Sequence, residues 1–176
     1  SELEDLVFTG RGRGAREVEQ ALMRGEVVQP AIVTADVALF RLLRRYGLRP
    51  ALVAGHSLGE YAALVAAGCL DFGQALRAVY VRGREMRRLA EGGEAGRMAM
   101  ISAPAAAVAP ALAGIDGYVT IANLNCRVQT VISGAAAAVD EAVARLGRAG
   151  LDCRVLPIAG AFHSELAGAI REPMRE

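Results

Sequence analysis

The sequence predicts an α/β protein with a parallel-sheet core and a separate small sheet. A wholly apolar run at 51–54 stands between two helical patterns, as expected of a central strand in a parallel sheet. A G-x-S-x-G motif at 55–59 joins this run to the next helix. After the glycine-rich segment 92–96, the pattern changes to strand, helix, strand, strand, helix, strand.

The first half of the chain is predicted to be mainly helical. Residues 14–24 have a weak helical pattern, and residues 29–47 form a strong amphipathic helix. Pro30 is expected in the first turn of that helix and Gly47 at its end, which are the positions that these residue types favour. The apolar strand at 51–54 follows.

Two more helices follow the G-x-S-x-G motif. The first is predicted to end at Gly68. Asp71 is the predicted N-cap of the second, because its carboxylate can accept a hydrogen bond from a backbone N–H of the first turn. That second helix is expected over residues 72–93.

The second half is predicted to form the small sheet with its helices. Its expected elements are strands at 97–102, 118–123, 128–134 and 151–158, with helices at 103–114, broken near Pro110, and at 136–150. This order is typical of a ferredoxin-like subdomain, which we assign to 97–158. Residues 1–96 and 159–176 then belong to a partial α/β-hydrolase-like large subdomain, and the second of these segments carries a histidine.

Charge and composition exclude several function classes. Twenty basic and nineteen acidic side chains nearly cancel, so we expect no binding to nucleic acid or to an anionic membrane. All the basic residues are arginine, which excludes Schiff-base chemistry and a phosphate-loop lysine. No apolar run reaches the roughly 18 to 20 residues needed to span a bilayer, and the N-terminus lacks the pattern of a signal peptide.

The cysteines and histidines do not have the spacing of a metal site. The three cysteines (Cys69, Cys126 and Cys153) and two histidines (His56 and His163) are scattered along the chain, so we expect no metal. The cysteines lie in predicted helix and strand interiors, and we interpret them as reduced core residues. A reducing compartment, the cytoplasm, is therefore expected.

Ser57 is the candidate nucleophile. Glycines two positions before and after it allow a sharp turn between strand and helix, which exposes the serine hydroxyl. The backbone N–H of Leu58, at the start of the helix, is placed to stabilise an oxyanion. The alternative is a glycine-flanked serine that only caps the helix.

His163 is the candidate base for that serine. A serine hydroxyl is a weak nucleophile until a base accepts its proton. His56 is adjacent in sequence, but on a tight turn its side chain should point away from Ser57. This leaves His163 as the only other imidazole, although a single histidine in a loop is more often structural.

An arginine-rich helical segment supplies the third candidate. Arg84, Arg87 and Arg88 fit a solvated helix face. Arg82 differs because it precedes Gly83, which leaves room for close approach, so its guanidinium could bind a carboxylate held near Ser57.

These stretches together resemble the malonyl-CoA:acyl carrier protein transacylase family, which includes the acyltransferase domains of polyketide and fatty acid synthases. The matching stretches are QPAIVTADVALFRLL, GHSLGEYAALVAAG, VRGREM, ANLNCRVQTVISG and GAFHS, in the family's order over residues 29–164. The resemblance implies an acyl-serine at Ser57 with His163 as base, and a carboxylate-binding role for Arg82. Relative to the family pattern, the chain is expected to be incomplete at both ends.

The resemblance also implies the substrates and partners. Malonyl-CoA would be the acyl donor, the phosphopantetheine thiol of an acyl carrier protein the acceptor, and no permanently bound cofactor is expected. Neighbouring domains of a multidomain synthase are further possible partners. Leu58 and Phe162 are similar to malonyl-selective members, since the Phe162 ring would crowd a 2-methyl branch.

Two other interpretations stay open at the level of the sequence. An α/β-hydrolase such as a thioesterase also uses a G-H-S-x-G motif, although Arg82 and the inserted small sheet argue against it. The chain could also be an inactive fragment of a larger acyltransferase domain.

Overall fold

The computed structural model describes residues 24–92, 96–158 and 160–175. The chain divides into two compact units, Ser1–Arg87 with Pro173–Glu176, and Arg88–Glu172. The division expected from the sequence has its first boundary at 96/97 instead, and assigns 159–176 to the large subdomain. The predicted helix at 14–24 lies outside the described residues.

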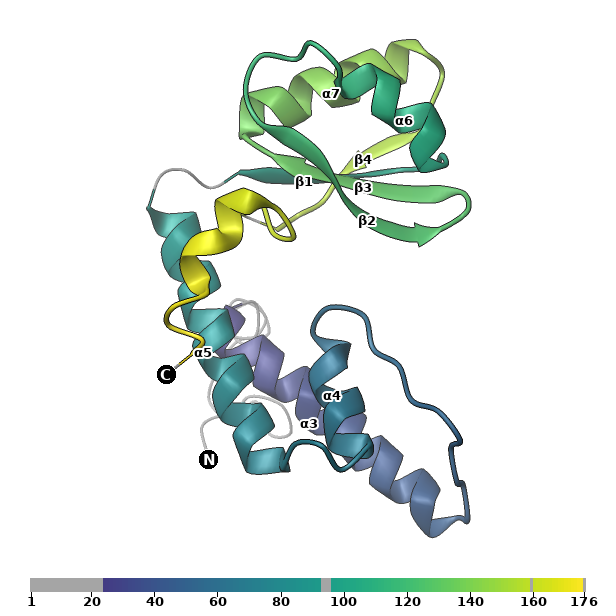
Figure 1. The fold of residues 1–176 in the computed structure, drawn as a ribbon, viewed down its shortest axis with the longest axis vertical. Helices are drawn as coiled ribbons and strands as arrows, with labels where there is room; N and C mark the ends of the chain where they lie inside the picture. The colour runs from purple at the N-terminus through teal and green to yellow at the C-terminus, as the bar shows by residue number, and fades with distance from the viewer. Residues whose placement is uncertain (1–23, 93–95, 159, 176) are drawn as a thin grey trace, which may run out of the picture. The chain divides into compact units, whose positions relative to one another are not determined.

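Within the described residues, the first unit consists of helices joined by irregular segments (Figure 1). The helices are α3 (Gly25–Arg45), α4 (Gly59–Ala66) and α5 (Phe72–Glu91), whose last residues extend into the second unit. Their buried apolar side chains form one cluster, composed of Val33, Val37, Ala75 and Val79 with half-buried neighbours on α4. The apolar periodicity of the sequence therefore predicted all three helices.

The start of α5 confirms the predicted cap. Asp71 Oδ1 accepts a hydrogen bond from the backbone N–H of Gln74 at 2.8 Å, and Gln74 Oε1 accepts one from the N–H of Asp71 at 3.1 Å. This reciprocal capping box satisfies two backbone donors that a helix N-terminus otherwise leaves unpaired.

A glycine contact brings α3 and α5 together. A Cβ atom added at Gly83 would lie 2.2 Å from the carbonyl oxygen of Gly25, and one added at Gly25 would lie 2.6 Å from that of Gly83. No side chain fits between backbones this close, so the close approach expected at Gly83 is made to the first turn of α3.

The start of α3 differs from the prediction. The helix begins at Gly25, so Pro30 lies inside it and not in the first turn. Pro30 removes one backbone hydrogen bond, but residues that precede it in the helix make contacts that stabilise the additional N-terminal turn. These are the Gly25–Gly83 contact and the ion pairs of Glu26, which periodicity does not reveal.

The predicted strand at 51–54 is not formed within the described residues. This segment is irregular, and Leu52 is 81% exposed. A strand exists only through backbone pairing, and no described segment pairs with this one. An apolar run alone does not specify which segment would pair with it, so the prediction of a strand here is wrong for the described residues.

The second unit contains a four-stranded antiparallel sheet, and the helices α6 (Ala105–Leu112) and α7 (Ala136–Arg148) cover one of its faces (Figure 1). Its elements, in chain order, are β1 (Arg97–Ile101), α6 (Ala105–Leu112), β2 (Val119–Cys126), β3 (Gln129–Gly134), α7 (Ala136–Arg148), β4 (Cys153–Val155) and the 3-10 helix η2 (Glu165–Ile170). The sheet order is β2-β3-β1-β4, with Ala99 opposite Ile132 and Val155. The predicted order of strands and helices is confirmed.

Several details of the second unit correct the prediction. Pro110 does not break α6 but lies inside it, and the helix ends two residues later; fully buried Val108, one turn before that end, anchors it to the core. β2 continues to Cys126, which leaves only Arg127 and Val128 as the hairpin link. β4 is shorter than expected. Backbone pairing in the sheet sets the boundaries of the strands.

The cysteines are free thiols, but of the three only Cys153 packs against a hydrophobic core. Cys69 and Cys126 are exposed, and Cys153 is half-buried at the start of β4. Cys69 follows the end of α4 and Cys126 ends β2 next to the hairpin link, so both lie where elements end and the chain meets solvent.

Candidate active site

Ser57 lies on a tight turn with an unusual backbone conformation. Its φ angle is +53°, in the left-handed region that non-glycine residues rarely occupy. The N–H of Gly59 donates to His56 O at 3.0 Å and the N–H of Glu60 donates to Ser57 O at 3.2 Å, which closes the turn into α4. The predicted sharp turn at the serine is thus present.

The two glycines of the motif differ in their steric surroundings. A Cβ atom on Gly55 would lie 2.3 Å from the backbone N of Glu60, so only glycine fits there. One on Gly59 would meet no described atom within 4 Å. Steric crowding therefore explains the glycine before the serine, but not the one after it.

Arg82 contacts the candidate nucleophile directly. Its Nη2 donates to Ser57 Oγ at 3.0 Å. Burial lowers the pKa of Arg82 from its ordinary value, while Tyr61 and Glu60 act in the opposite direction. Arginine stays charged through such shifts, so a cation is held beside the serine hydroxyl.

Gln29 is a residue of this site that sequence reasoning missed. Its Oε1 accepts a hydrogen bond from Arg82 Nη1 at 2.8 Å, and its Nε2 donates to Met86 Sδ at 3.3 Å. The signal was available, because Gln29 precedes buried Val33 and Val37 by four and eight residues on one helix face. A polar residue on a buried stripe indicates a specific partner.

His163 and Phe162 belong to the second unit. His163 is exposed and has a φ angle of +58°; Ser57 and His163 are the two non-glycine residues with positive φ in the described part of the chain. Ser164 Oγ donates to Ala161 O at 2.5 Å across this turn. The half-buried Phe162 ring packs on Gly160, where an added Cβ would lie 2.6 Å from it.

The structure therefore brings together Ser57, Arg82 and Gln29, and Leu58 follows the serine within the same turn. No backbone carbonyl of the described residues accepts the N–H of Leu58. The approach of His163 and Phe162 to the serine remains a prediction.

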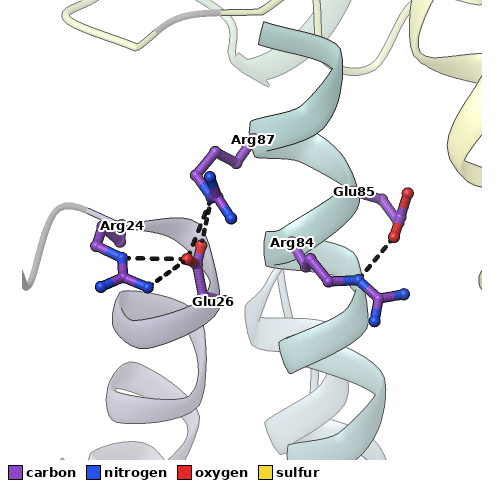
Figure 2. A network of polar contacts seen from close by, with 5 residues as sticks. All are labelled: Arg24, Glu26, Arg84, Glu85 and Arg87. Carbon is purple, nitrogen blue, oxygen red and sulfur yellow. Dashed lines mark hydrogen bonds and ion pairs between the residues drawn. The ribbon is translucent and has the colours of Figure 1, made fainter. Parts of the chain in front are cut away.

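The arginines around Arg82 are not simply a solvated face (Figure 2). Nε of Arg87 donates to the carboxylate of buried Glu26 at 3.1 Å, and Arg24 donates to the same carboxylate at 2.9 Å. Arg84 pairs with buried Glu85 at 2.8 Å. These arginines are partly exposed, yet they neutralise buried carboxylates, which corrects the expectation for Arg84 and Arg87.

Neither a metal cluster nor a membrane span was found in the part of the chain that the structure describes. No three His, Cys, Asp or Glu side chains there gather in a way that could hold a metal ion. None of the helices there combines the length and the apolar character of a transmembrane span.

A family of acyl-transferring domains matches nearly the whole chain. The sequence profile described as "Acyl transferase domain" matches residues 7–176. The chain therefore belongs to the acyl transferase domain family.

Two bacterial relatives are named alike. The chain is 39% identical, over its full length, to the malonyl CoA-acyl carrier protein transacylase of Bacillus subtilis and covers 55% of that protein. It is 41% identical, over 79% of its length, to the malonyl CoA-acyl carrier protein transacylase of Escherichia coli and covers 46% of it. The chain thus spans about half the length of these relatives.

Solved structures of acyltransferases are also similar to this chain. The acyltransferase domain from the second module of the salinomycin polyketide synthase matches 99% of this chain at 38% identity with a TM-score of 0.85, and the chain covers 39% of it. An acyl carrier protein S-malonyltransferase from Vibrio cholerae matches 98% at 34% identity and a TM-score of 0.85, with 55% of that structure covered. The α/β fold of this chain is similar to theirs.

Proposed function

We propose that this chain carries the nucleophile of an acyltransferase that moves a malonyl group from coenzyme A to the phosphopantetheine thiol of an acyl carrier protein. The observation that carries the proposal is the hydrogen bond from Arg82 Nη2 to Ser57 Oγ, on a serine held at positive φ. A cation beside the nucleophile suits an acyl group that carries its own carboxylate.

The reaction has two steps. Ser57 Oγ attacks the thioester carbonyl carbon while His163 accepts the hydroxyl proton, the C–S bond breaks, and coenzyme A leaves as the thiol with that proton. The carrier thiol then gives its proton to His163 and attacks the carbonyl carbon of the acyl-serine, the C–O bond to Ser57 breaks, and Ser57 Oγ takes up that proton. The N–H of Leu58 stabilises the oxyanion in both steps. It is available for this role because no backbone carbonyl of the described residues accepts a hydrogen bond from it.

Substrate choice is assigned to two side chains. Arg82 binds the free carboxylate of the malonyl group, and Phe162 limits the space at the carbon between the two carbonyl groups. Steric exclusion of one methyl group is worth about 1 to 3 kcal/mol, so the preference for malonyl over methylmalonyl is moderate.

The carrier protein and coenzyme A are the proposed partners. One solved relative, at 33% identity and a TM-score of 0.86, is described as a type II polyketide synthase acyl carrier protein in complex with its malonyl-transacylase. Other relatives are large polyketide synthases, which supports neighbouring synthase domains as further partners. The cytoplasm is the proposed compartment, because all three cysteines are free.

The sheet and the serine turn support the proposed division into two subdomains. The order β2-β3-β1-β4 with two helices on one face supports a ferredoxin-like subdomain over 97–158. The serine turn followed directly by α4 supports a hydrolase-like large subdomain formed by 1–96 and 159–176.

Intact-mass measurement tests the nucleophile. The chain is mixed with malonyl-CoA, and we expect a mass increase of one malonyl group that is absent in Ser57→Ala. Ser102→Ala is the matched control, since this exposed serine lies in the other unit and should leave the adduct unchanged.

The acceptor distinguishes transfer from hydrolysis. Addition of carrier protein bearing phosphopantetheine should move the malonyl group to the carrier. Release of free malonate instead would favour a thioesterase. An adduct that persists in Ser57→Ala, or a chain that melts cooperatively and forms none, contradicts the proposal; the second result indicates an inactive fragment.

A further inference from the structure

Gln29 is buried where α3 passes the candidate site. Only 8% of the residue is exposed, and both ends of its amide are engaged. The thioether of Met86 can accept but not donate, so it selects the orientation in which the amide NH₂ faces sulfur. The amide oxygen then faces Arg82 Nη1 at 2.8 Å.

The partners of Arg82 differ in charge from those of its neighbours. Arg84 and Arg87 are each paired with a buried carboxylate (Figure 2). Within the described residues, Arg82 donates hydrogen bonds to the Gln29 amide and to the Ser57 hydroxyl, which are both neutral. No described carboxylate forms a direct ion pair with the guanidinium, and Glu60 acts on it only at longer range, so Arg82 is held in place with its positive charge available.

We propose that Gln29 is a positioning residue that sets acyl-group selectivity, by holding the Arg82 guanidinium beside Ser57 through a neutral acceptor. The inference rests on the proposed function of Ser57 and Arg82. A glutamate at position 29 would have nearly the same shape and reach, but it would neutralise Arg82 and compete with the substrate carboxylate. The neutral amide is therefore what keeps the cation available.

Acylation kinetics of three variants test the charge argument. Single-turnover acylation of Ser57 is measured with malonyl-CoA and with acetyl-CoA in the wild type, in Gln29→Glu and in Gln29→Met, which keeps the side-chain length without the acceptor. Ala38→Glu is the control, since it adds a carboxylate to an exposed position of the same helix. We expect the malonyl-to-acetyl rate ratio to fall about tenfold in Gln29→Glu and less in Gln29→Met, and to be unchanged in Ala38→Glu.

A purely structural role for Gln29 predicts a different pattern. It would lower melting temperature in both variants and leave the malonyl-to-acetyl ratio at the wild-type value, which overturns the inference. A wild type that forms no malonyl adduct overturns the proposed function instead.

A second readout tests the positioning without any activity. The guanidinium of Arg82, assigned by its loss in Arg82→Lys, should give resolved Nη resonances in nitrogen-15 spectra, because hydrogen bonds slow its rotation. We expect these resonances to broaden or merge in Gln29→Met but not in Ala38→Glu. Unchanged Arg82 resonances in Gln29→Met would contradict the positioning role.

Discussion

Two residues of the described chain combine reactive side chains with a strained backbone. Ser57 and His163 both have positive φ, at +53° and +58°, and each residue held there costs about 1 to 2 kcal/mol. Such strain persists only where the surrounding structure imposes it, and it is concentrated at functional sites. It coincides here with the two side chains that the sequence nominated for acyl transfer.

Replacing Arg82 should change the preferred acyl group. In Arg82→Ala the malonyl carboxylate loses its charged donor, so we expect the malonyl adduct rate to fall about tenfold or more relative to the acetyl adduct rate. Intact mass after incubation with each acyl-CoA measures this. Arg77→Ala, an exposed arginine on the same helix, should leave the preference unchanged; equal preference in Arg82→Ala and wild type would refute the carboxylate role.

Truncating Phe162 should widen acceptance of branched acyl groups. Phe162→Ala removes the ring proposed to crowd a 2-methyl branch, so the methylmalonyl-to-malonyl rate ratio should rise by about tenfold, within the range of one methyl contact. Competition between the two acyl-CoA donors, read by mass, measures the ratio. A ratio that does not rise would mean that Phe162 only packs on Gly160.

At the scale of elements, α3 and α5 depend on a contact between two glycines. The backbones of Gly25 and Gly83 approach too closely for any side chain, and the adjacent Arg82 is thereby brought near α3, where Gln29 meets it. Gly83 therefore allows the two helices to approach, and this approach lets Arg82 donate a hydrogen bond to Gln29.

A methyl group at this crossing should destabilise the protein. Gly83→Ala would place Cβ 2.2 Å from Gly25 O, and such overpacking typically costs about 1 to 3 kcal/mol in the free energy of unfolding. Urea unfolding followed by circular dichroism measures it. Gly147→Ala on α7 is the control: its Cβ meets no described atom within 4 Å, and alanine should add about 0.5 to 1 kcal/mol there. If Gly83→Ala were as stable as the wild type, the close contact would be wrong.

At the scale of the whole molecule, Glu26 makes stability depend on pH. Burial raises the pKa of this carboxyl, but the hydrogen bonds from its own backbone N–H and from Arg24, together with the charges of Arg87 and Arg24, outweigh burial and hold the pKa below its ordinary value of 4.5. A depressed folded-state pKa contributes stability above pH 4.5, and this contribution is lost as the pH falls through the folded-state value.

Removing this carboxylate should therefore cost stability only where it is ionised. We expect Glu26→Gln to lower the free energy of unfolding by about 1 kcal/mol at pH 7, because the partner arginines are partly exposed. The difference from the wild type should shrink as the pH falls below 4.5. Urea unfolding at a series of pH values measures it, and a pH-independent difference would contradict the assignment.

Local sequence patterns determined much of this protein. Apolar periodicity predicted α3, α4 and α5, Asp71 predicted the cap of α5, and alternating and helical patterns predicted the order of elements around the four-stranded sheet. The glycine-flanked serine likewise predicted the sharp turn at Ser57. These features depend on interactions between residues a few positions apart, which a single sequence records directly.

Only the tertiary structure decided the features that join distant segments. The Gln29–Arg82 hydrogen bond spans 53 positions and the Arg87–Glu26 ion pair spans 61, and no periodicity encodes such pairs. The same holds for the early start of α3, which the Gly25–Gly83 contact and Glu26 stabilise against Pro30. Helix packing brings these side chains together, so the surroundings of Arg82 became visible only once the helices were placed side by side.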